Sequence, residues 1–259
     1  MISLTPGQIE AWLAAYLWPF LRIGACLMVA PVFGARFVPA RFKILLAAAI
    51  TLIVTPLLPP LPDVSPFSGA GLVITVQQMV IGVAVGFVLQ IVFDSLAMGG
   101  QLLANTMGLS FAFNVDPLRG TGTPVLGQFY TLIGTLTFLA LNGHIAVIQA
   151  MVDGFRTMPI GTSGLGAEGM WQIALWGNAL FRGALMVALP GLTALLIVNL
   201  AFGVVSRAAP SLNLFAIGFP VTLIGGLLIV LAGLPAVQSG FVTLMRETLD
   251  FSAALMQAR

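Results

Sequence analysis

The chain is short of charged residues. Of its 259 residues, 10 are Lys or Arg and 8 are Asp or Glu, together 7%. A soluble protein usually carries about 25% charged residues. So few charges cannot cover a globule with a solvated surface, which excludes a soluble enzyme and a disordered tail. The net charge of +2 is also too small to grip a phosphate backbone, so we expect no nucleic-acid partner.

Residues that carry chemistry are equally scarce. Cys26 is the only cysteine, so no disulfide can form within the chain. His144 is the only histidine, and we expect it to be a helix-end or packing residue rather than part of a metal or catalytic cluster. The only lysine, Lys43, does not stand in a GxxxxGK phosphate-binding loop. We therefore expect no enzymatic activity, no cofactor and no metal.

Hydrophobic residues make up 59% of the chain. This composition predicts an all-α polytopic membrane protein, because a spanning helix needs about 20 mostly apolar residues. The N-terminal segment lacks a basic region and carries Glu10, so we do not expect a cleaved signal peptide. The pattern predicts six helices over residues 12–33, 44–58, 71–104, 125–152, 179–205 and 214–234, followed by a short amphipathic tail.

Some of these predicted helices are irregular. The second is short and can begin within the preceding basic segment. The third, at about 1.5 Å per residue, is longer than a bilayer is thick, so it leaves the bilayer, tilts strongly or breaks at Gly99–Gly100. Pro190–Gly191 predicts a kink in the fifth helix, since proline removes a backbone donor.

Basic residues predict the orientation. The first connection holds Arg36, Arg41 and Lys43 without an acid, whereas the second holds only Asp63. Short loops rich in Lys and Arg stay in the cytoplasm. We therefore expect both the N-terminus and the C-terminus to face outward.

A few polar residues lie inside the apolar runs. Arg22 and Asp94 are costly if they face lipid. They indicate either a water-filled pathway or proton relay, or a pairing within or between chains, or a position at the membrane edge. Gln90, Asp94 and Gln101 share one helical face with Asn105, and this face can line a pore or contact a partner. Nearby, Gly82 and Gly86 form GxxxG, a motif that favours close helix packing but is common by chance here.

Three separated motifs resemble the FliR family, the export-apparatus proteins of flagellar type III secretion and their injectisome relatives. The first is SRAAPSLNLFAIGFPVTLIGG at 206–226 and the second is GLSFAFNVDP at 108–117. A weaker match is APVFGARFVPARFK at 30–43. The motifs occur in the family's order along essentially the whole chain.

The resemblance implies a subunit that joins FliP and FliQ in a helical export gate of the inner membrane, within the flagellar basal body. The gate passes unfolded protein cargo and works with FlhA and FlhB. Within the single membrane domain, residues 1–170 would form a FliP-like four-helix part and residues 171–259 a FliQ-like hairpin.

The resemblance also implies two functional segments. One is a loop that plugs the channel, with Phe111 and Phe113 as apolar stoppers, although both can instead anchor the loop to the bundle. The plug comprises Gly108, Phe111, Phe113, Asp116 and Pro117. The other is a cytoplasmic hairpin tip close to FlhB, comprising Ser206, Arg207, Pro210 and Asn213.

An alternative function is a secondary transporter or channel for a small solute, with its site at a helix break such as Pro190–Gly191. Transporters usually have paired broken helices in two related halves, and the sequence shows no strong internal repeat. Co-purification distinguishes these functions, because only the export gate predicts two small apolar partner subunits.

Overall fold

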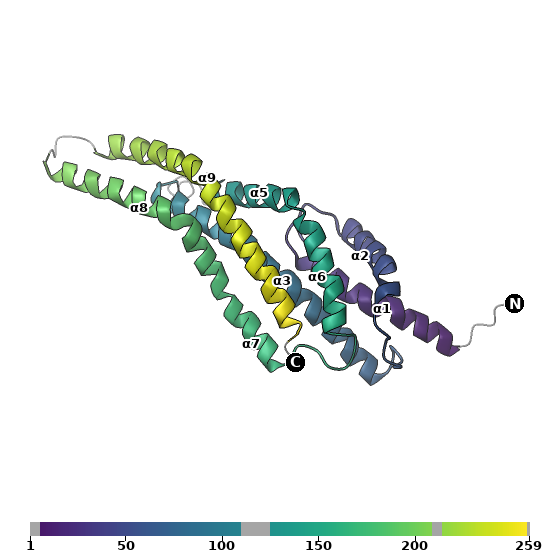
Figure 1. Cartoon of the computed structure of the whole chain (residues 1–259). Helices are drawn as coiled ribbons and strands as arrows, with labels where there is room; N and C mark the ends of the chain where they lie inside the picture. The colour runs from purple at the N-terminus through teal and green to yellow at the C-terminus, as the bar shows by residue number, and fades with distance from the viewer. Residues whose placement is uncertain (1–5, 110–124, 209–213, 258–259) are drawn as a thin grey trace, which may run out of the picture. The chain divides into compact units, whose positions relative to one another are not determined.

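The computed structural model describes residues 6–109, 125–208 and 214–257, and its regular structure within these ranges is helical throughout (Figure 1). Helices suit so apolar a chain because they pair their own backbone groups where no water is available. The elements are α1 (Pro6–Val29), α2 (Ala40–Val54) with a short 3-10 turn (Thr55–Leu57), α3 (Gly69–Thr106), α5 (Val125–Ala140), α6 (Gly143–Thr157), α7 (Ala167–Trp176), α8 (Asn178–Ala208) and α9 (Leu214–Leu255).

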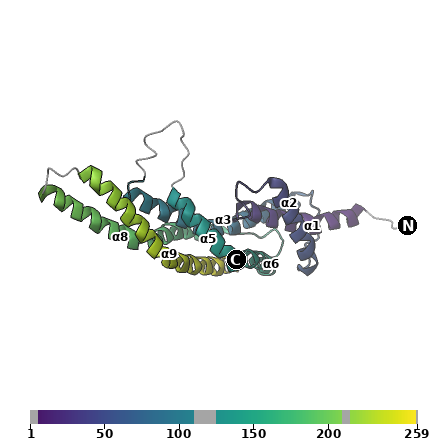
Figure 2. The same ribbon diagram turned by 90° about the horizontal axis from the view of Figure 1, so that it is seen from above.

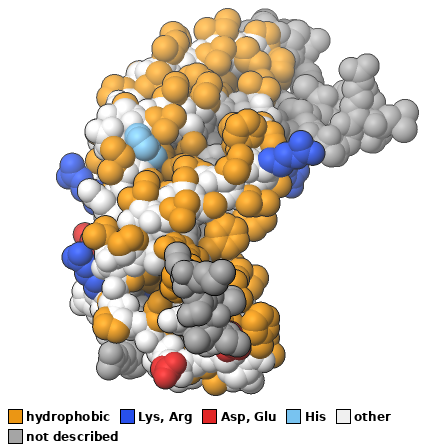
Figure 3. All heavy atoms as spheres, turned by 90° about the vertical axis from the view of Figure 1, so that its right-hand side faces the viewer, with side chains coloured by type: hydrophobic (Ala, Val, Ile, Leu, Met, Phe, Trp, Pro, Cys, Tyr) orange, Lys and Arg blue, Asp and Glu red, His pale blue; other side chains and the backbone are white. Residues whose placement is uncertain are grey.

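Among the described residues, five helices are long and apolar enough to cross a membrane, or six if α5 and α6 together count as one broken span. The second span begins at Ala40, inside the basic segment, as expected. Large apolar side chains are exposed on several of these helices, and they predominate on the face drawn in Figure 3. The all-α polytopic fold predicted from composition is confirmed.

The prediction of one continuous fourth helix over residues 125–152 is wrong. Instead, α5 and α6 meet at a bend of 68°. Asn142 lies at the break, with a φ of 56° in the left-handed region that asparagine tolerates better than most residues. The dipeptide Asn142–Gly143 is a turn signal that could have placed this break from sequence.

The two C-terminal helices are longer than predicted. The fifth begins before Ala179, as α7, and continues after Gly177 as α8, which runs through Pro190 and bends along its course in Figure 1. The sixth was expected to end near Leu234, but α9 passes through Pro220 and Pro235 and includes the expected tail. Apolar helices tolerate proline because neighbouring groups and local adjustments satisfy the freed backbone.

The chain forms two compact units. The first holds α1, α2, α6, α7, the part of α3 up to Ile91 and the end of α9 from Arg246. The second holds α5, α8, the rest of α3 and most of α9.

In the first unit, α1 packs closely on α3 along the GxxxG pair. A Cβ at Gly82 would collide with the carbonyl oxygen of Arg22, and one at Gly86 would lie 2.7 Å from the carbonyl oxygen of Cys26. One turn earlier, the indole Nε1 of Trp18 donates to the hydroxyl of Thr75 at 3.2 Å. The motif therefore marks a genuine close contact between helices.

In the second unit, α3 does not break at Gly99–Gly100. Both glycines instead admit neighbouring helices: a Cβ at Gly99 would lie 3.0 Å from the carbonyl oxygen of Ala184 in α8, and one at Gly100 2.6 Å from that of Leu126 in α5. Local propensity favours a break at two glycines, but here the packing of α5 and α8 keeps the helix continuous.

Aromatic rings complete the core of this unit. Phe93 of α3 packs edge-to-face with Phe138 of α5, with ring centroids 5.7 Å apart, and with Phe241 of α9, at 5.3 Å. Edge-to-face pairs at such distances stabilise a core beyond their buried area.

Candidate functional site

Arg22 lies in the interior of the first unit, with only 3% of its surface exposed. Its Nη1 donates to the carbonyl oxygen of Met158 at 2.8 Å, and its Nη2 donates to that of Gly154 at 2.9 Å. The Nη2 group also lies 3.6 Å from the sulfur of Met256, and the guanidinium is 4.5 Å from the ring centroid of Phe155.

These contacts explain why an arginine is tolerated inside an apolar run. Both carbonyl groups lie at the C-terminal end of α6, where the helix dipole is negative. The Gly154 carbonyl also accepts the N–H of Met158 at 3.0 Å. The positively charged guanidinium of Arg22 adds a hydrogen bond to each of these carbonyls at the negative end of the dipole. Of the alternatives considered from sequence, the structure shows a contact within the chain, since the side chain is buried and bound to backbone of the same chain.

The predicted polar face of α3 is largely outward. Gln90, in the first unit, is half-buried, whereas Asp94, Gln101 and Asn105 are exposed in the second unit. On the opposite side of the same helical segment, Phe93, Leu96 and Leu103 are buried. This half of α3 therefore offers polar groups outside the core of its own chain.

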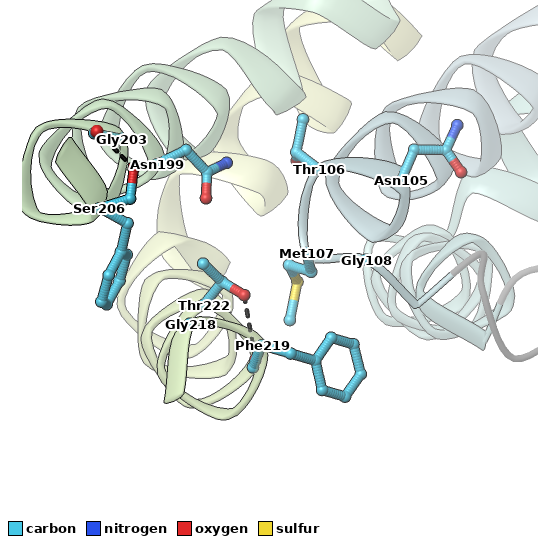
Figure 4. Close-up of a pocket in the computed structure, with 11 residues that line it drawn as sticks. Asn105, Thr106, Met107, Gly108, Asn199, Gly203, Ser206, Gly218, Phe219 and Thr222 are labelled. Atoms are coloured by element: carbon cyan, nitrogen blue, oxygen red, sulfur yellow. Dashed lines mark hydrogen bonds between the residues drawn. The ribbon is translucent and has the colours of Figure 1, made fainter. Parts of the chain in front are cut away.

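The C-terminal end of α3 lies beside the hairpin of α8 and α9. The three helices enclose an open cavity of about 610 Å³ (Figure 4), which we call the hairpin groove. The first half of α9 runs beside α8 in two perpendicular views (Figures 1 and 2). The groove is lined by Asn105, Thr106, Met107, Gly108, Asn199, Phe202, Gly203, Ser206, Gly218, Phe219 and Thr222.

Gly108 ends α3 by a specific backbone arrangement. Its φ is 79°, its N–H donates to the carbonyl oxygen of Asn105 at 3.1 Å, and the N–H of Leu109 donates to that of Ala104 at 3.0 Å. These are the two hydrogen bonds of a Schellman stop, in which glycine is favoured because its φ is positive. The predicted plug segment therefore starts directly at a defined helix end.

Most hydroxyl groups of the groove are occupied by their own helices. Ser206 donates to the carbonyl oxygen of Gly203 at 2.8 Å, and Thr222 donates to that of Phe219 at 3.0 Å. By contrast, the carboxamide of Asn199 points into the groove in Figure 4 and bonds no other residue that the structure describes. An amide in an apolar helix that has no partner of its own is a candidate binding group.

The structure brings together parts of both predicted segments. Gly108, from the predicted plug, and Ser206, from the predicted hairpin tip, line the same groove. Arg207 follows Ser206 and is exposed. The remaining residues of these segments lie outside the described ranges: Phe111, Phe113, Asp116, Pro117, Pro210 and Asn213.

Sequence reasoning missed most residues of the groove, among them Asn199, Met107 and Phe219. Asn199 could have been found as a lone amide in the apolar run of α8, by the same argument that selected Gln101. Met107 and Phe219 gave no such signal, because apolar residues in an apolar helix are not distinctive. Their position in the groove depends on how α3 and α9 pack.

Fold and groove together define a polytopic helical membrane protein with no soluble domain in its described part. Comparison with known families then identifies it further. The sequence model of "Bacterial export proteins, family 1" matches residues 13–248, and the chain belongs to this family. It is therefore a multi-pass protein of the inner membrane.

Curated relatives agree along nearly the whole chain. The chain is similar to the flagellar biosynthetic protein FliR of Escherichia coli (strain K12), with 40% identity over 99% of this chain and 98% of the relative. It is 36% identical to that of Pectobacterium carotovorum subsp. carotovorum over the same shares. The FliR of Bacillus subtilis (strain 168) is 28% identical over 80% of each chain. The predicted resemblance is confirmed, and membership of an export family supports a non-enzymatic role.

Proposed function

We propose that this chain is a subunit of the flagellar type III protein export gate. It forms, with FliP and FliQ, the inner-membrane channel that passes unfolded flagellar proteins during flagellum assembly. The observation that carries this proposal is the agreement in sequence with FliR proteins over almost the entire length. FlhA and FlhB are the further partners that the resemblance implies.

The described geometry supports a role for the segment after Gly108. A Schellman stop fixes the point where this segment leaves α3, and the same point borders the hairpin groove. A plug must be anchored to rigid elements so that its bulky side chains return to one place. We propose that Phe111 and Phe113 block the channel from this anchor, with Asp116 and Pro117 in the same loop.

Outward-facing apolar side chains support an assembly with other subunits. On α8, Leu196, Ile197 and Leu200 are exposed, and on α9 so are Ile224 and Leu228. Such faces need lipid or another helix to cover them. The division into a FliP-like part, 1–170, and a FliQ-like hairpin, 171–259, stays a prediction.

Co-expression tests the proposal. The tagged chain is expressed together with FliP and FliQ from one plasmid and purified in mild detergent. An unrelated tagged protein with six membrane spans, expressed with the same FliP and FliQ, is the control. We expect a stable complex that contains all three subunits, and none with the control. A chain that purifies alone and binds a small solute would instead favour the transporter alternative.

A further inference from the structure

The hairpin groove combines an apolar surface with positive charge. Between Glu168 and Glu247 the chain carries three arginines and no acid. One of them, Arg207, lies in the last turn of α8, directly after the groove residue Ser206. Arg207 is exposed and makes no ion pair with another described residue. An anionic group at this end of the hairpin would therefore meet a cation and no competing carboxylate from α8 or α9.

The interior of the groove suits an acyl chain. Phe202, Phe219 and Met107 are apolar residues of its lining. The carboxamide of Asn199 points into the groove (Figure 4). Exposed leucine and isoleucine side chains continue on α8 and α9 away from the groove. A ligand with an anionic head and an apolar tail matches the cation at the end of α8 and the apolar walls beside it.

We propose that the hairpin groove binds one anionic phospholipid. An acyl chain lies against Phe202 and Phe219, and the phosphate pairs with Arg207. Anionic lipids are concentrated in the cytoplasmic leaflet, and basic groups between membrane helices bind their head groups. The positive-inside rule places the tip with Arg207 on that side.

The size of the groove favours a lipid over a partner helix. A helix with side chains is about 10 Å wide, so a cavity of about 610 Å³ would hold little more than one of its turns. So short a contact gives a helix few residues with which to anchor itself. A thin acyl chain can fill the same volume along its length.

Gly203 offers a position from which a side chain can enter the groove, and Gly233 offers a comparable position outside it. A Cβ at Gly203, in the groove, or at Gly233, outside it on α9, would have no atom within 4 Å. Gly203→Leu should therefore occupy the acyl-chain site, and Gly233→Leu is its matched control. The thermal unfolding midpoint of the full-length chain in detergent is measured with added phosphatidylglycerol or phosphatidylcholine.

We expect phosphatidylglycerol to raise the midpoint of the unchanged chain and of Gly233→Leu, but not that of Gly203→Leu. Phosphatidylcholine should have a much smaller effect. If Gly203→Leu retains the full increase, or if both lipids act equally, the proposal is wrong. The test does not depend on the export function, because it needs neither FliP nor FliQ.

A second pair of variants tests the head group. Arg207→Gln should weaken phosphatidylglycerol binding about fivefold, the effect of one basic side chain at an anionic surface. Arg246→Gln is the control, since Arg246 is also exposed and makes no ion pair with a described residue. Inorganic phosphate should not compete, because the acyl chain supplies much of the binding. Equal effects of the two arginine variants would overturn the assignment of Arg207.

Discussion

Replacement of Gly86 by alanine tests the close contact between α1 and α3. The added Cβ would lie 2.7 Å from the carbonyl oxygen of Cys26, 3.0 Å from the backbone nitrogen of Ala30 and 3.0 Å from the Cβ of Val29. All three atoms belong to backbone or to its first side-chain carbon. None can rotate away, so the helices must separate.

The size of the effect follows from two opposing contributions. Overpacking a tight contact costs about 1–3 kcal/mol, and rigid backbone neighbours place Gly86 at about 3 kcal/mol. Alanine regains about 1 kcal/mol because it is a better helix former than glycine. We therefore expect Gly86→Ala to lower the free energy of unfolding by about 2 kcal/mol, or the unfolding midpoint by about 4–8 °C in a chain of this size.

Gly233→Ala is the matched control. Gly233 is also inside a long apolar helix, but a Cβ there would have no atom within 4 Å. Only the helix-propensity gain remains, so this variant should be about 1 kcal/mol more stable than the unchanged chain. The two identical substitutions should thus shift stability in opposite directions.

The single cysteine provides the assay. Cys26 is buried on α1 at the contact itself, and no other cysteine in the chain can react. A thiol-reactive maleimide dye added during heating reports when α1 leaves α3. Gly86→Ala should label at a lower temperature and Gly233→Ala at a slightly higher one. Unchanged labelling of Gly86→Ala would refute the close contact.

Three further predictions concern single features. Arg22→Ala should lower the free energy of unfolding by about 3 kcal/mol, because two charge-assisted hydrogen bonds at about 1.5 kcal/mol each are lost. Arg22→Met also removes the charge and these bonds, but it should cost less than Arg22→Ala because it keeps most of the buried side-chain volume; the same labelling assay measures both. Replacement of Phe111 and Phe113 by glycine should make cells or liposomes that carry the whole complex leak small solutes, and unchanged permeability would contradict the plug. A reporter fused to the C-terminus should be active only outside the cytoplasm, since six crossings return the chain to the side of its N-terminus; activity confined to the cytoplasm would refute this.

The sequence predicted the class and most helices, because long apolar runs leave few other structures. It failed where packing outweighs local preference. Gly99 and Gly100 favour a helix break in isolation, yet α5 and α8 pack on them and keep α3 whole. The last helix was expected to end near Leu234, but α9 continues through Pro235 to Leu255. Neither outcome is encoded within the few residues around the glycines or the proline.

For the candidate site, the sequence identified the predicted plug and the predicted hairpin tip, but not that they lie beside the same groove. Gly108 and Ser206 are 98 positions apart, and only the folded chain shows that both border one groove. Asn199 was detectable as a polar residue in an apolar helix, whereas Met107 and Phe219 were not. Motif resemblance locates functional segments because it compares them one at a time. Their geometry depends on contacts between distant helices.

The few charges illustrate how position changes the meaning of one residue type. Arg22 and Arg207 both lie near a helix C-terminus, where a cation is favourable. Arg22 is enclosed by Gly154, Met158 and Phe155, so its charge is used inside the chain. Arg207 is exposed beside an open groove and has no described acidic partner, so its charge is available to something else. In a chain with so few charges, an exposed arginine at a groove that pairs with no described acid is where a ligand should be sought first.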